Sequence, residues 1–502
     1  MLKYKIFLVL LIAAAGISTS CKSSLFAGEP PVSEQPSLPA TPVVVDGMRT
    51  SYADVVERTS IAVVRIEAEH KEFEQPRGPQ SSPGEDFFKQ FPQQLPQQMP
   101  QQNQRPRVER GAGSGVIVNA DGTILTNNHV VSGAQKITVL TSDNKSYQAK
   151  IVGTDEPSDL AVIKIEALNL PFLTLGNSDQ VRVGDIVLAI GNPLGIGQTV
   201  TAGIISAKGR RTGLSDGSFE DFLQTDAPIN RGNSGGALVN LNSELVGINS
   251  QILSPGGAQG GNIGIAFSIP SNMAKSVMEQ LVKDGKVRRG MLGINIQNIS
   301  DDIAKAFDLK ERSGVLVSGV KAGSAAEKAG LKRNDVIVGI NGEKIEDSNV
   351  LRNKVAGTLP QSTIKLAIIR DGQPSEVTAT LDEFDTKTSK TPGDGPENGL
   401  TEPDGKEQGG KLGLSLEPVT PQIAKQLGLE SDSEGLVVTQ VDPNGPAAES
   451  GMARGDVILE INRKAVNNVQ DVKTALDAAT GKPIILLVTR RGQTGYITIR
   501  SN

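Results

Sequence analysis

The 502-residue chain contains one cysteine, two histidines and no tryptophan. A single cysteine, Cys21, excludes a disulfide within the chain. Because protein zinc sites are built largely from histidine and cysteine ligands, their scarcity argues against zinc, and we expect no metal and no other cofactor. If an imidazole activates a nucleophile here, the general base must be His70 or His129.

The chain also lacks the features of a nucleic-acid-binding protein. Its formal net charge is −5, and no block of lysine and arginine interleaved with aromatic residues occurs. Apolar residues make up 37% of the chain and glycine reaches 55 residues. This mixture favours a turn-rich β protein over a helical bundle, and the length allows about three domains.

The N-terminus has the layout of an export signal. Two lysines precede the apolar run Ile6–Ala15, and small polar residues lead to Cys21. The position of Cys21 favours a bacterial lipoprotein signal with a lipidated cysteine. Ordinary secretion and an uncleaved anchor are the alternatives, although the run is short for a span of ~20 residues. We expect a signal peptide over residues 1–20 and a flexible tether, rich in proline and serine, over residues 21–50.

Short apolar segments with glycine and proline breaks fill the first half of the chain. Their spacing, without regular helical segments between them, predicts a mainly β fold, either an antiparallel barrel or a sandwich. The predicted strands are 61–66, 111–118, 122–131, 137–140, 147–152, 160–165, 181–190, 200–206, 237–239, 245–248 and 263–267.

One good helical pattern spans residues 271–285. Ser271 is the predicted N-cap and Gly285 the predicted C-terminal stop. The apolar residues predicted to face the core are Met273, Val277, Leu281 and Val282.

Ser234 is a candidate nucleophile. Glycines on both sides allow positive φ angles and inward-pointing N–H groups, which a developing oxyanion needs. A plain Gly/Asn/Ser turn between two strands is the alternative. His129 follows a strand-like segment, and either Asp155 or Asp159 could orient its ring. Spacing does not separate the two aspartates, although Asp159 borders the apolar strand that would bury it.

Two further segments stand out. The small residues of Gly111–Val118 let another backbone approach closely, and a phosphate-binding loop is disfavoured because no Lys-Ser/Thr and no helix follow. Residues 72–110 are too rich in glutamine and proline to pack, yet they carry a phenylalanine cluster. They form either a disordered insertion or a loop that contacts a partner subunit or the active site.

An internal repeat fills the C-terminal part. Gly314–Asn341 aligns without a gap to Gly435–Asn462, and a Leu-Gly-aliphatic triplet precedes each copy, at Leu292–Ile294 and Leu412–Leu414. The sequence therefore predicts two copies of one module. Residues 384–410, dense in glycine, proline and charge, are the predicted flexible linker.

Three motifs occur in the order histidine, aspartate, serine. They are Thr-Asn-Asn-His-Val at Thr126–Val130, Ser-Asp-Leu-Ala-Val at Ser158–Val162 and Gly-Asn-Ser-Gly-Gly at Gly232–Gly236. Together they resemble the HtrA/DegP family of envelope serine proteases, and the resemblance runs from about Ser51 to the C-terminus. It implies a chymotrypsin-like double antiparallel β-barrel followed by two PDZ domains of α+β type.

The resemblance also implies the catalytic residues. His129 would be the general base, Asp159 would orient it, and Ser234 would attack the scissile carbonyl. The family motif thus selects Asp159 over the other aspartate. The N–H groups of Gly232 and Ser234, with Asn233 between them, would form the oxyanion hole.

Regulatory and specificity positions follow from the same resemblance. Arg210 falls where the family senses an occupied regulatory domain, with a solvated basic loop as the alternative. Ile252 and Ile265 would line the first specificity pocket and favour a small aliphatic residue before the cut, although core packing explains Ile265 equally well. Phe88 and Phe91 would anchor the long Gln/Pro-rich loop in a neighbouring subunit's site.

The first repeat carries the better peptide-binding loop. Its backbone N–H groups would hold a peptide C-terminus while a strand edge pairs with the peptide, and the second copy would serve mainly in assembly. The loop residues are Met291, Leu292, Gly293 and Ile294.

The expected function is ATP-independent endoproteolysis of unfolded or damaged envelope proteins, regulated by peptide binding and combined with chaperone activity. A non-proteolytic chaperone or surface-binding scaffold is the alternative. Expected partners are unfolded polypeptides, peptide C-termini, further copies of the chain in trimers or larger cages, and a membrane through the lipid anchor. The expected domains are a protease at 51–285 and PDZ domains at 288–383 and 411–502.

Overall fold

The computed structural model describes residues 44–45, 48–71, 108–193, 197–212, 219–230, 232–252, 261–309, 311–384, 412–427, 429, 433–477, 483–490 and 492–500. The chain divides into two units, residues 1–54 and residues 55–502. In the first unit, β1 (Val44–Val45) pairs with β2 (Met48–Arg49). The second unit contains every described residue of the predicted site.

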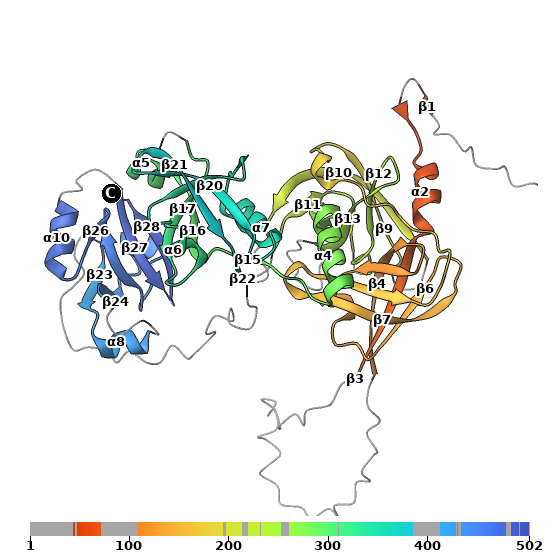
Figure 1. Cartoon of the computed structure of the whole chain (residues 1–502), viewed down its shortest axis with the longest axis horizontal. Helices are drawn as coiled ribbons and strands as arrows, with labels where there is room; N and C mark the ends of the chain where they lie inside the picture. The colour runs from red at the N-terminus through yellow and green to blue at the C-terminus, as the bar shows by residue number, and fades with distance from the viewer. Residues whose placement is uncertain are drawn as a thin grey trace, which may run out of the picture. The chain divides into compact units, whose positions relative to one another are not determined.

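Six antiparallel strands close into a first barrel in the order β3-β4-β5-β8-β7-β6, orange in Figure 1. Their bounds are β3 (Val63–Lys71), β4 (Val108–Asn119), β5 (Thr123–Thr126), β6 (Lys136–Leu140), β7 (Ser146–Asp155) and β8 (Leu160–Ile165). Strand β8 is buried at every position except Lys164 because it is almost wholly apolar, whereas buried residues in β6 alternate with more exposed ones. Helices α2 (Ala53–Ser60) and α3 (Asn128–Val131) accompany this barrel.

A second closed barrel follows in the order β10-β11-β14-β13-β12-β9. Its strands are β9 (Ile186–Gly191), β10 (Thr199–Arg210), β11 (Phe222–Thr225), β12 (Ala237–Asn240), β13 (Leu245–Ile252) and β14 (Ala266–Pro270). The two barrels confirm the predicted double-barrel fold. Strand β11 was not predicted, because four residues give no readable alternation and only its pairing with β10 and β14 defines it.

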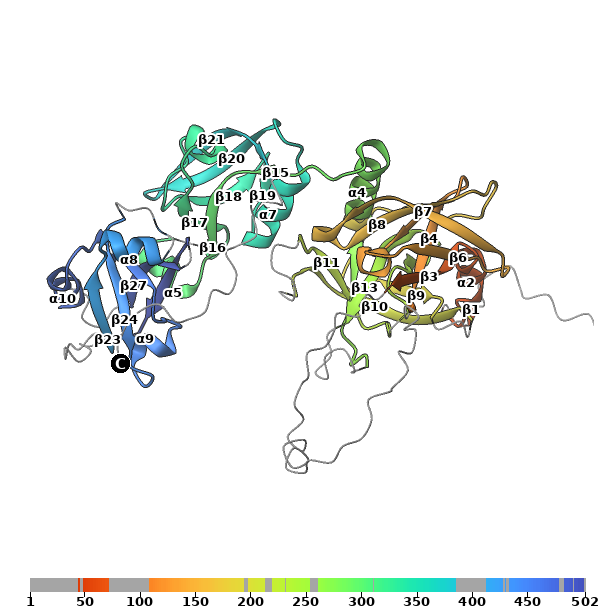
Figure 2. The same ribbon diagram turned by 90° about the horizontal axis from the view of Figure 1, so that it is seen from below.

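Helix α4 (Ser271–Asp284) packs against β7 and β8 of the first barrel and β13 and β14 of the second (Figure 2). Gly285 ends it with φ +68°, as predicted. Two predictions for this helix are wrong: Ser271 as its N-cap, and Val282 as a residue of its buried face. The Ser271 hydroxyl donates to the Gly176 carbonyl at 2.7 Å instead of capping, and Val282 is 56% exposed. The buried residues follow helical spacing from the first turn: Ser271, Ala274, Val277 and Leu281.

Two similar modules complete the second unit, shown in teal and blue in Figure 2. The first has the strand order β16-β17-β18-β20-β21 and the second has β23-β24-β25-β27-β28. The first module comprises β15 (Gly290–Met291), β16 (Ile294–Asn298), α5 (Asp301–Ala306), β17 (Val315–Val320), α6 (Ala325–Lys328), β18 (Val336–Ile340), β19 (Glu343–Lys344), α7 (Ser348–Gly357), β20 (Thr363–Arg370), β21 (Gln373–Thr380) and β22 (Asp382–Glu383). The second comprises β23 (Leu414–Pro418), α8 (Pro421–Gln426), β24 (Leu436–Val441), α9 (Pro446–Glu449), β25 (Val457–Ile461), β26 (Lys464–Ala465), α10 (Val469–Asp477), β27 (Ile484–Arg490) and β28 (Gln493–Ile499).

Equivalent ion pairs confirm that the modules are copies. The side chain of Asp335 is 1% exposed and accepts from Arg370 at 2.7 Å, and that of Asp456, also 1% exposed, accepts from Arg490 at 2.5 Å. Each arginine also donates to the carbonyl of an equivalent glycine, Gly330 or Gly451. The repeat seen in the sequence therefore extends to the buried polar contacts.

Candidate active site

His129 and Asp159 come together at one end of the first barrel. His129 lies in α3, just beyond the end of β5, and Asp159 follows the 3-10 turn η2 (Glu156–Ser158) with φ +53°. The imidazole Nδ1 lies 2.9 and 2.8 Å from the two carboxylate oxygens of Asp159, and the His129 N–H donates to Oδ1 at 3.0 Å. Aspartate tolerates this left-handed conformation better than most residues. The ring therefore presents its other nitrogen, Nε2, away from the carboxylate.

The backbone of Asp159 is anchored as well as its side chain. Its carbonyl accepts from the Asn127 side-chain amide at 2.9 Å and from the Asn128 N–H at 3.1 Å. Both donors flank the start of the helix that carries His129. The two residues of the pair are thus fixed to each other through main chain and side chain.

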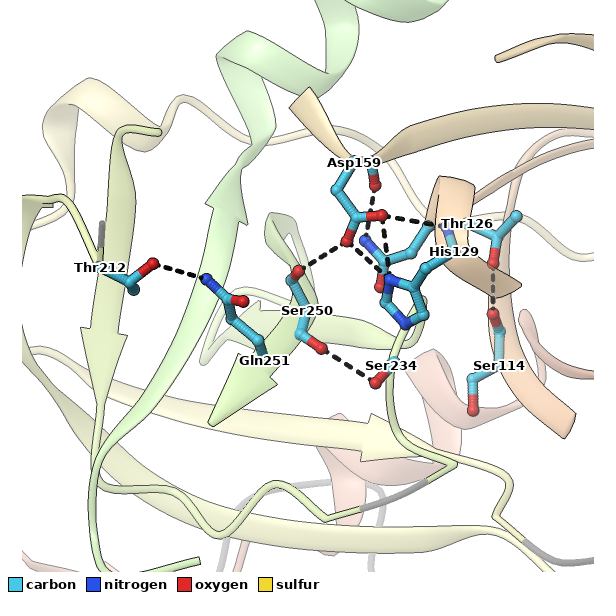
Figure 3. A network of polar contacts seen from close by, with 9 residues as sticks. Ser114, Thr126, His129, Asp159, Thr212, Ser234, Ser250 and Gln251 are labelled. Atoms are coloured by element: carbon cyan, nitrogen blue, oxygen red, sulfur yellow. Dashed lines mark hydrogen bonds and ion pairs between the residues drawn. The ribbon is translucent and has the colours of Figure 1, made fainter. Parts of the chain in front are cut away.

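Ser234 faces this pair from the second barrel (Figure 3). Its hydroxyl donates to the Ser250 carbonyl at 2.9 Å. The Ser250 hydroxyl in turn donates to Asp159 Oδ2 at 2.9 Å. Among the described residues, no hydrogen bond joins Ser234 to His129.

Ser250 was missed by the sequence analysis. It lies on β13, whose apolar pattern predicted a strand, but a serine in a strand carries no mark of its role. The contact with Asp159 joins positions 91 apart in the chain. Only the packing of the two barrels shows it.

The backbone around Ser234 has the shape that its glycines suggested. Gly232 has φ +94° and Gly235 has φ +82°. The Asn233 N–H donates to the Asn230 carbonyl at 3.0 Å. Gly232 directly precedes this donor, and a type II turn requires a positive φ at that position. Within the described part of the chain, the N–H groups of Gly232 and Ser234 have no acceptor.

Strand β4 holds this loop in place. The Ser114 N–H donates to the Ser234 carbonyl at 2.8 Å, and the Ser114 hydroxyl donates to the Gly232 carbonyl at 2.6 Å. A Cβ on Gly113 would lie 2.7 Å from a methyl of Val130, and one on Gly235 would lie 2.1 Å from the Ser114 carbonyl. The prediction that Gly111–Val118 admits another backbone is confirmed, and that backbone is the serine loop.

The other aspartate and histidine lie elsewhere. Asp155, at the end of β7, forms a buried ion pair with Arg289 and does not contact His129. His70 lies on β3, where its ring approaches Gly111 and Gly133. Neither residue touches Ser234 in the described structure.

Of the predicted pocket and regulatory residues, three are described. Ile252 and Ile265 are half-buried, and Ile252 packs against the apolar core of the second barrel. Arg210 is exposed at the end of β10, with its Nε donating to the Gln224 side chain at 3.1 Å. Phe88, Phe91 and Cys21 lie outside the described residues.

The predicted peptide-binding loop lies at the edge of the first module. Met291 ends β15, Leu292 is buried in the module core, Gly293 has φ +77°, and Ile294 begins β16. The carbonyls of Leu292 and Gly293 accept from backbone N–H groups at 2.9 Å each. The loop is thus tied down through its carbonyl groups.

No group of three or more histidine, cysteine, aspartate or glutamate side chains within the described ranges is arranged to hold a metal ion. None of the described helices is both long and apolar enough to cross a membrane.

The double barrel and the His129–Asp159 pair beside Ser234 define the class of trypsin-like serine proteases, here joined to two peptide-binding modules. Family models agree: residues 113–248 match a trypsin-like peptidase domain, and residues 290–381 and 437–490 each match a PDZ domain. The chain belongs to the DegP/HtrA family of periplasmic serine endoproteases.

Relatives span nearly the whole chain. A probable DegP-like periplasmic serine endoprotease of Chlamydia trachomatis is 43% identical over 432 residues, covering 85% of this chain and 82% of the relative. The periplasmic pH-dependent serine endoprotease DegQ of Escherichia coli is 39% identical, covering 90% of this chain and 91% of its own length. The solved HtrA-type protease AlgW with a tripeptide has a TM-score of 0.53 and 39% identity, covering 67% of this chain and 98% of that one.

Proposed function

We propose that the chain cleaves unfolded envelope proteins with Ser234, His129 and Asp159 as its catalytic residues. The observation that carries this proposal is the double contact of Asp159 with His129 Nδ1, which fixes the ring tautomer and turns Nε2 toward the serine (Figure 3). A serine needs such an oriented base to become nucleophilic.

In the proposed reaction, Ser234 Oγ attacks the scissile carbonyl carbon and its proton passes to His129 Nε2. The protonated ring then gives this proton to the leaving amine, and water hydrolyses the acyl-enzyme by the same route. The Ser234 hydroxyl must first leave the Ser250 carbonyl. A main-chain N–H of the substrate would compete for that carbonyl and so release the serine.

The N–H groups of Gly232 and Ser234, on either side of Asn233, form the proposed oxyanion hole. Their lack of acceptors among the described residues supports this, as does the positive φ of Gly232. In comparable sites, loss of one donor lowers the rate by roughly 10²–10³-fold. Ile252 and Ile265 are the proposed lining of the pocket for a small aliphatic side chain before the cut.

The first PDZ domain is the proposed regulatory site, with Met291, Leu292, Gly293 and Ile294 binding a peptide C-terminus. Structures of the relative AlgW with a tripeptide and a decapeptide support peptide recognition in this architecture. Arg210 would sense the occupied domain. The protease domains would form trimers, and contacts between PDZ domains would join these into larger cages. Phe88 and Phe91 as loop anchors and Cys21 as a lipid anchor rest on the sequence pattern.

The test is degradation of casein, without ATP, by the wild type and by Ser234→Ala and His129→Ala. Both variants should lose cleavage while still binding unfolded casein, and His70→Ala should stay within a few-fold of the wild type. Cleavage by Ser234→Ala at the wild-type rate would refute the assignment of the nucleophile. A strong loss in His70→Ala alone would mean that the base is misassigned.

A further inference from the structure

Gln251 follows Ser250 on β13 and points its side chain toward Thr212, just beyond the end of β10 (Figure 3). Its Nε2 donates to Thr212 Oγ1 at 3.2 Å, and both side chains are half-buried. The proposed reaction assigns no role to either residue. Gln251 is nevertheless the chain neighbour of Ser250, whose carbonyl accepts from the Ser234 hydroxyl. Its side chain therefore lies next to the place where a substrate must bind.

Glu220 determines which end of the Gln251 amide faces Thr212. Glu220 is 5% exposed, and its carboxylate accepts from the Thr212 N–H at 2.6 Å and from the Thr212 hydroxyl at 3.1 Å. Because the hydroxyl gives its single proton to Glu220, it can only accept from Gln251. The amide therefore turns its nitrogen to Thr212. Within the described part of the chain, no group donates to the amide oxygen, Oε1, which can accept from another molecule.

The edge of β13 beside Ser234 can pair with an extended substrate. Among the described residues, β12 pairs with β13 only as far as Ile248, and beyond it the Ser250 carbonyl points to the Ser234 hydroxyl. In a trans peptide the C=O and the following N–H point in opposite directions, whereas the N–H and C=O of one extended residue point to the same side. Those of Gln251 therefore point away from the site, and those of Ile252 point toward it.

A substrate strand that pairs antiparallel with this edge has a fixed register. The substrate residues that bind Ser250 and Ile252 are two positions apart, with the one at Ile252 earlier in the substrate. The residue whose N–H binds the Ser250 carbonyl presents its own carbonyl to Ser234, so it directly precedes the cut. The residue before it lies opposite Gln251. Side chains of directly opposite residues share one face, with Cβ atoms about 4.5–5.5 Å apart.

We propose that Gln251 determines specificity for the second substrate residue before the cut, and that it selects a side chain with a hydrogen-bond donor, such as asparagine, serine or threonine. The inference rests on the proposed role of Ser234 as nucleophile. Gln251 Oε1 accepts from the substrate side chain, and Thr212 and Glu220 hold the amide so that this oxygen faces the substrate. The preference is separate from that of the pocket for the residue directly before the cut.

The test measures kcat/KM of the full-length chain on two peptides that carry asparagine or leucine, which are similar in size, as the second residue before the cut. Mass spectrometry of the products confirms that both are cut at the same bond. The asparagine-to-leucine ratio should fall about 3–10-fold in Gln251→Met, because one hydrogen bond to the substrate is lost. Thr212→Val should lower the ratio part of the way, since the amide can then turn its nitrogen to the substrate.

An unchanged ratio in Gln251→Met would overturn the proposal, even if both peptides were cleaved more slowly, because damage to the fold acts on both alike. The matched control places the same asparagine and leucine at the third residue before the cut, whose side chain projects on the other face of the substrate strand. A change of the same size there would also overturn the proposal. Failure of the proposed function is a separate result: it appears as cleavage of both peptides by Ser234→Ala.

Discussion

Replacing Ser114 by alanine tests how the first barrel supports the serine loop of the second. Ser114 is fully buried, and its hydroxyl donates to the Gly232 carbonyl at 2.6 Å and accepts from the Asn192 N–H at 2.8 Å. The variant loses both bonds and keeps the backbone bond to Ser234. The loop therefore stays attached, while the Gly232 peptide of the proposed oxyanion hole loses its support.

The expected cost in folding stability follows from these two bonds. Each is worth about 0.5–1.5 kcal/mol net, so Ser114→Ala should cost about 1–3 kcal/mol. For a domain of roughly 200 residues this lowers the melting temperature by about 2–12 °C. The position of the Gly232 N–H also becomes less fixed. Because this N–H belongs to the proposed oxyanion hole, its greater mobility should lower kcat roughly 10–100-fold.

Ser271→Ala is the matched control for this variant. Ser271 is also fully buried and its hydroxyl donates to a backbone carbonyl at 2.7 Å, but it lies in α4, away from the serine loop. Thermal unfolding of the protease transition and kcat on a peptide substrate are measured for both. If Ser114→Ala loses no more kcat than Ser271→Ala at a similar loss of stability, the support attributed to Ser114 is refuted.

Three further predictions concern groups outside the triad. Burial, followed by the charge of Asp179, raises the pKa of Asp221 to about 6 from 3.8. The folded state disfavours the ionised carboxylate, so ionisation of Asp221 lowers the free energy of unfolding. This loss of stability is absent below the pKa of Asp221 in the unfolded chain and complete above its pKa in the folded protein. Asp221→Asn should raise the melting temperature at about pH 8, by an amount equivalent to about 1–3 kcal/mol, and not below about pH 4; equal shifts at both pH values would contradict this. Gly235→Ala should cost about 3–5 kcal/mol in urea unfolding, whereas Gly184→Ala, also with positive φ but with open space around it, should cost about 1–2 kcal/mol. Asp335→Ala and Asp456→Ala should each destabilise their own PDZ domain by about 3–5 kcal/mol, and unequal calorimetric losses would show that the two ion pairs are not equivalent.

The sequence predicted features whose residues lie close together in the chain. Glycines around Ser234 indicated a tight loop, and the aligned repeat indicated two modules, because both signals are local. The double barrel came from strand spacing together with the family resemblance. What was missed joins distant positions: the hydroxyl of Ser114 meets Gly232 across 118 positions, and Ser250 meets Asp159 across 91. Serine in a strand has no local pattern that would distinguish these two from serines that only face solvent.

Residue type and spacing did not decide whether Asp155 or Asp159 orients the His129 ring. The two aspartates lie four positions apart, at either end of the same turn, and either carboxylate could have met a histidine. Their difference is made by Arg289, 134 positions after Asp155, which pairs with the buried aspartate. Asp159, at the other end of the turn, has a left-handed conformation, and its side chain is 28% exposed beside His129. Asp155 is occupied by Arg289, and Asp159 is the aspartate that contacts the imidazole.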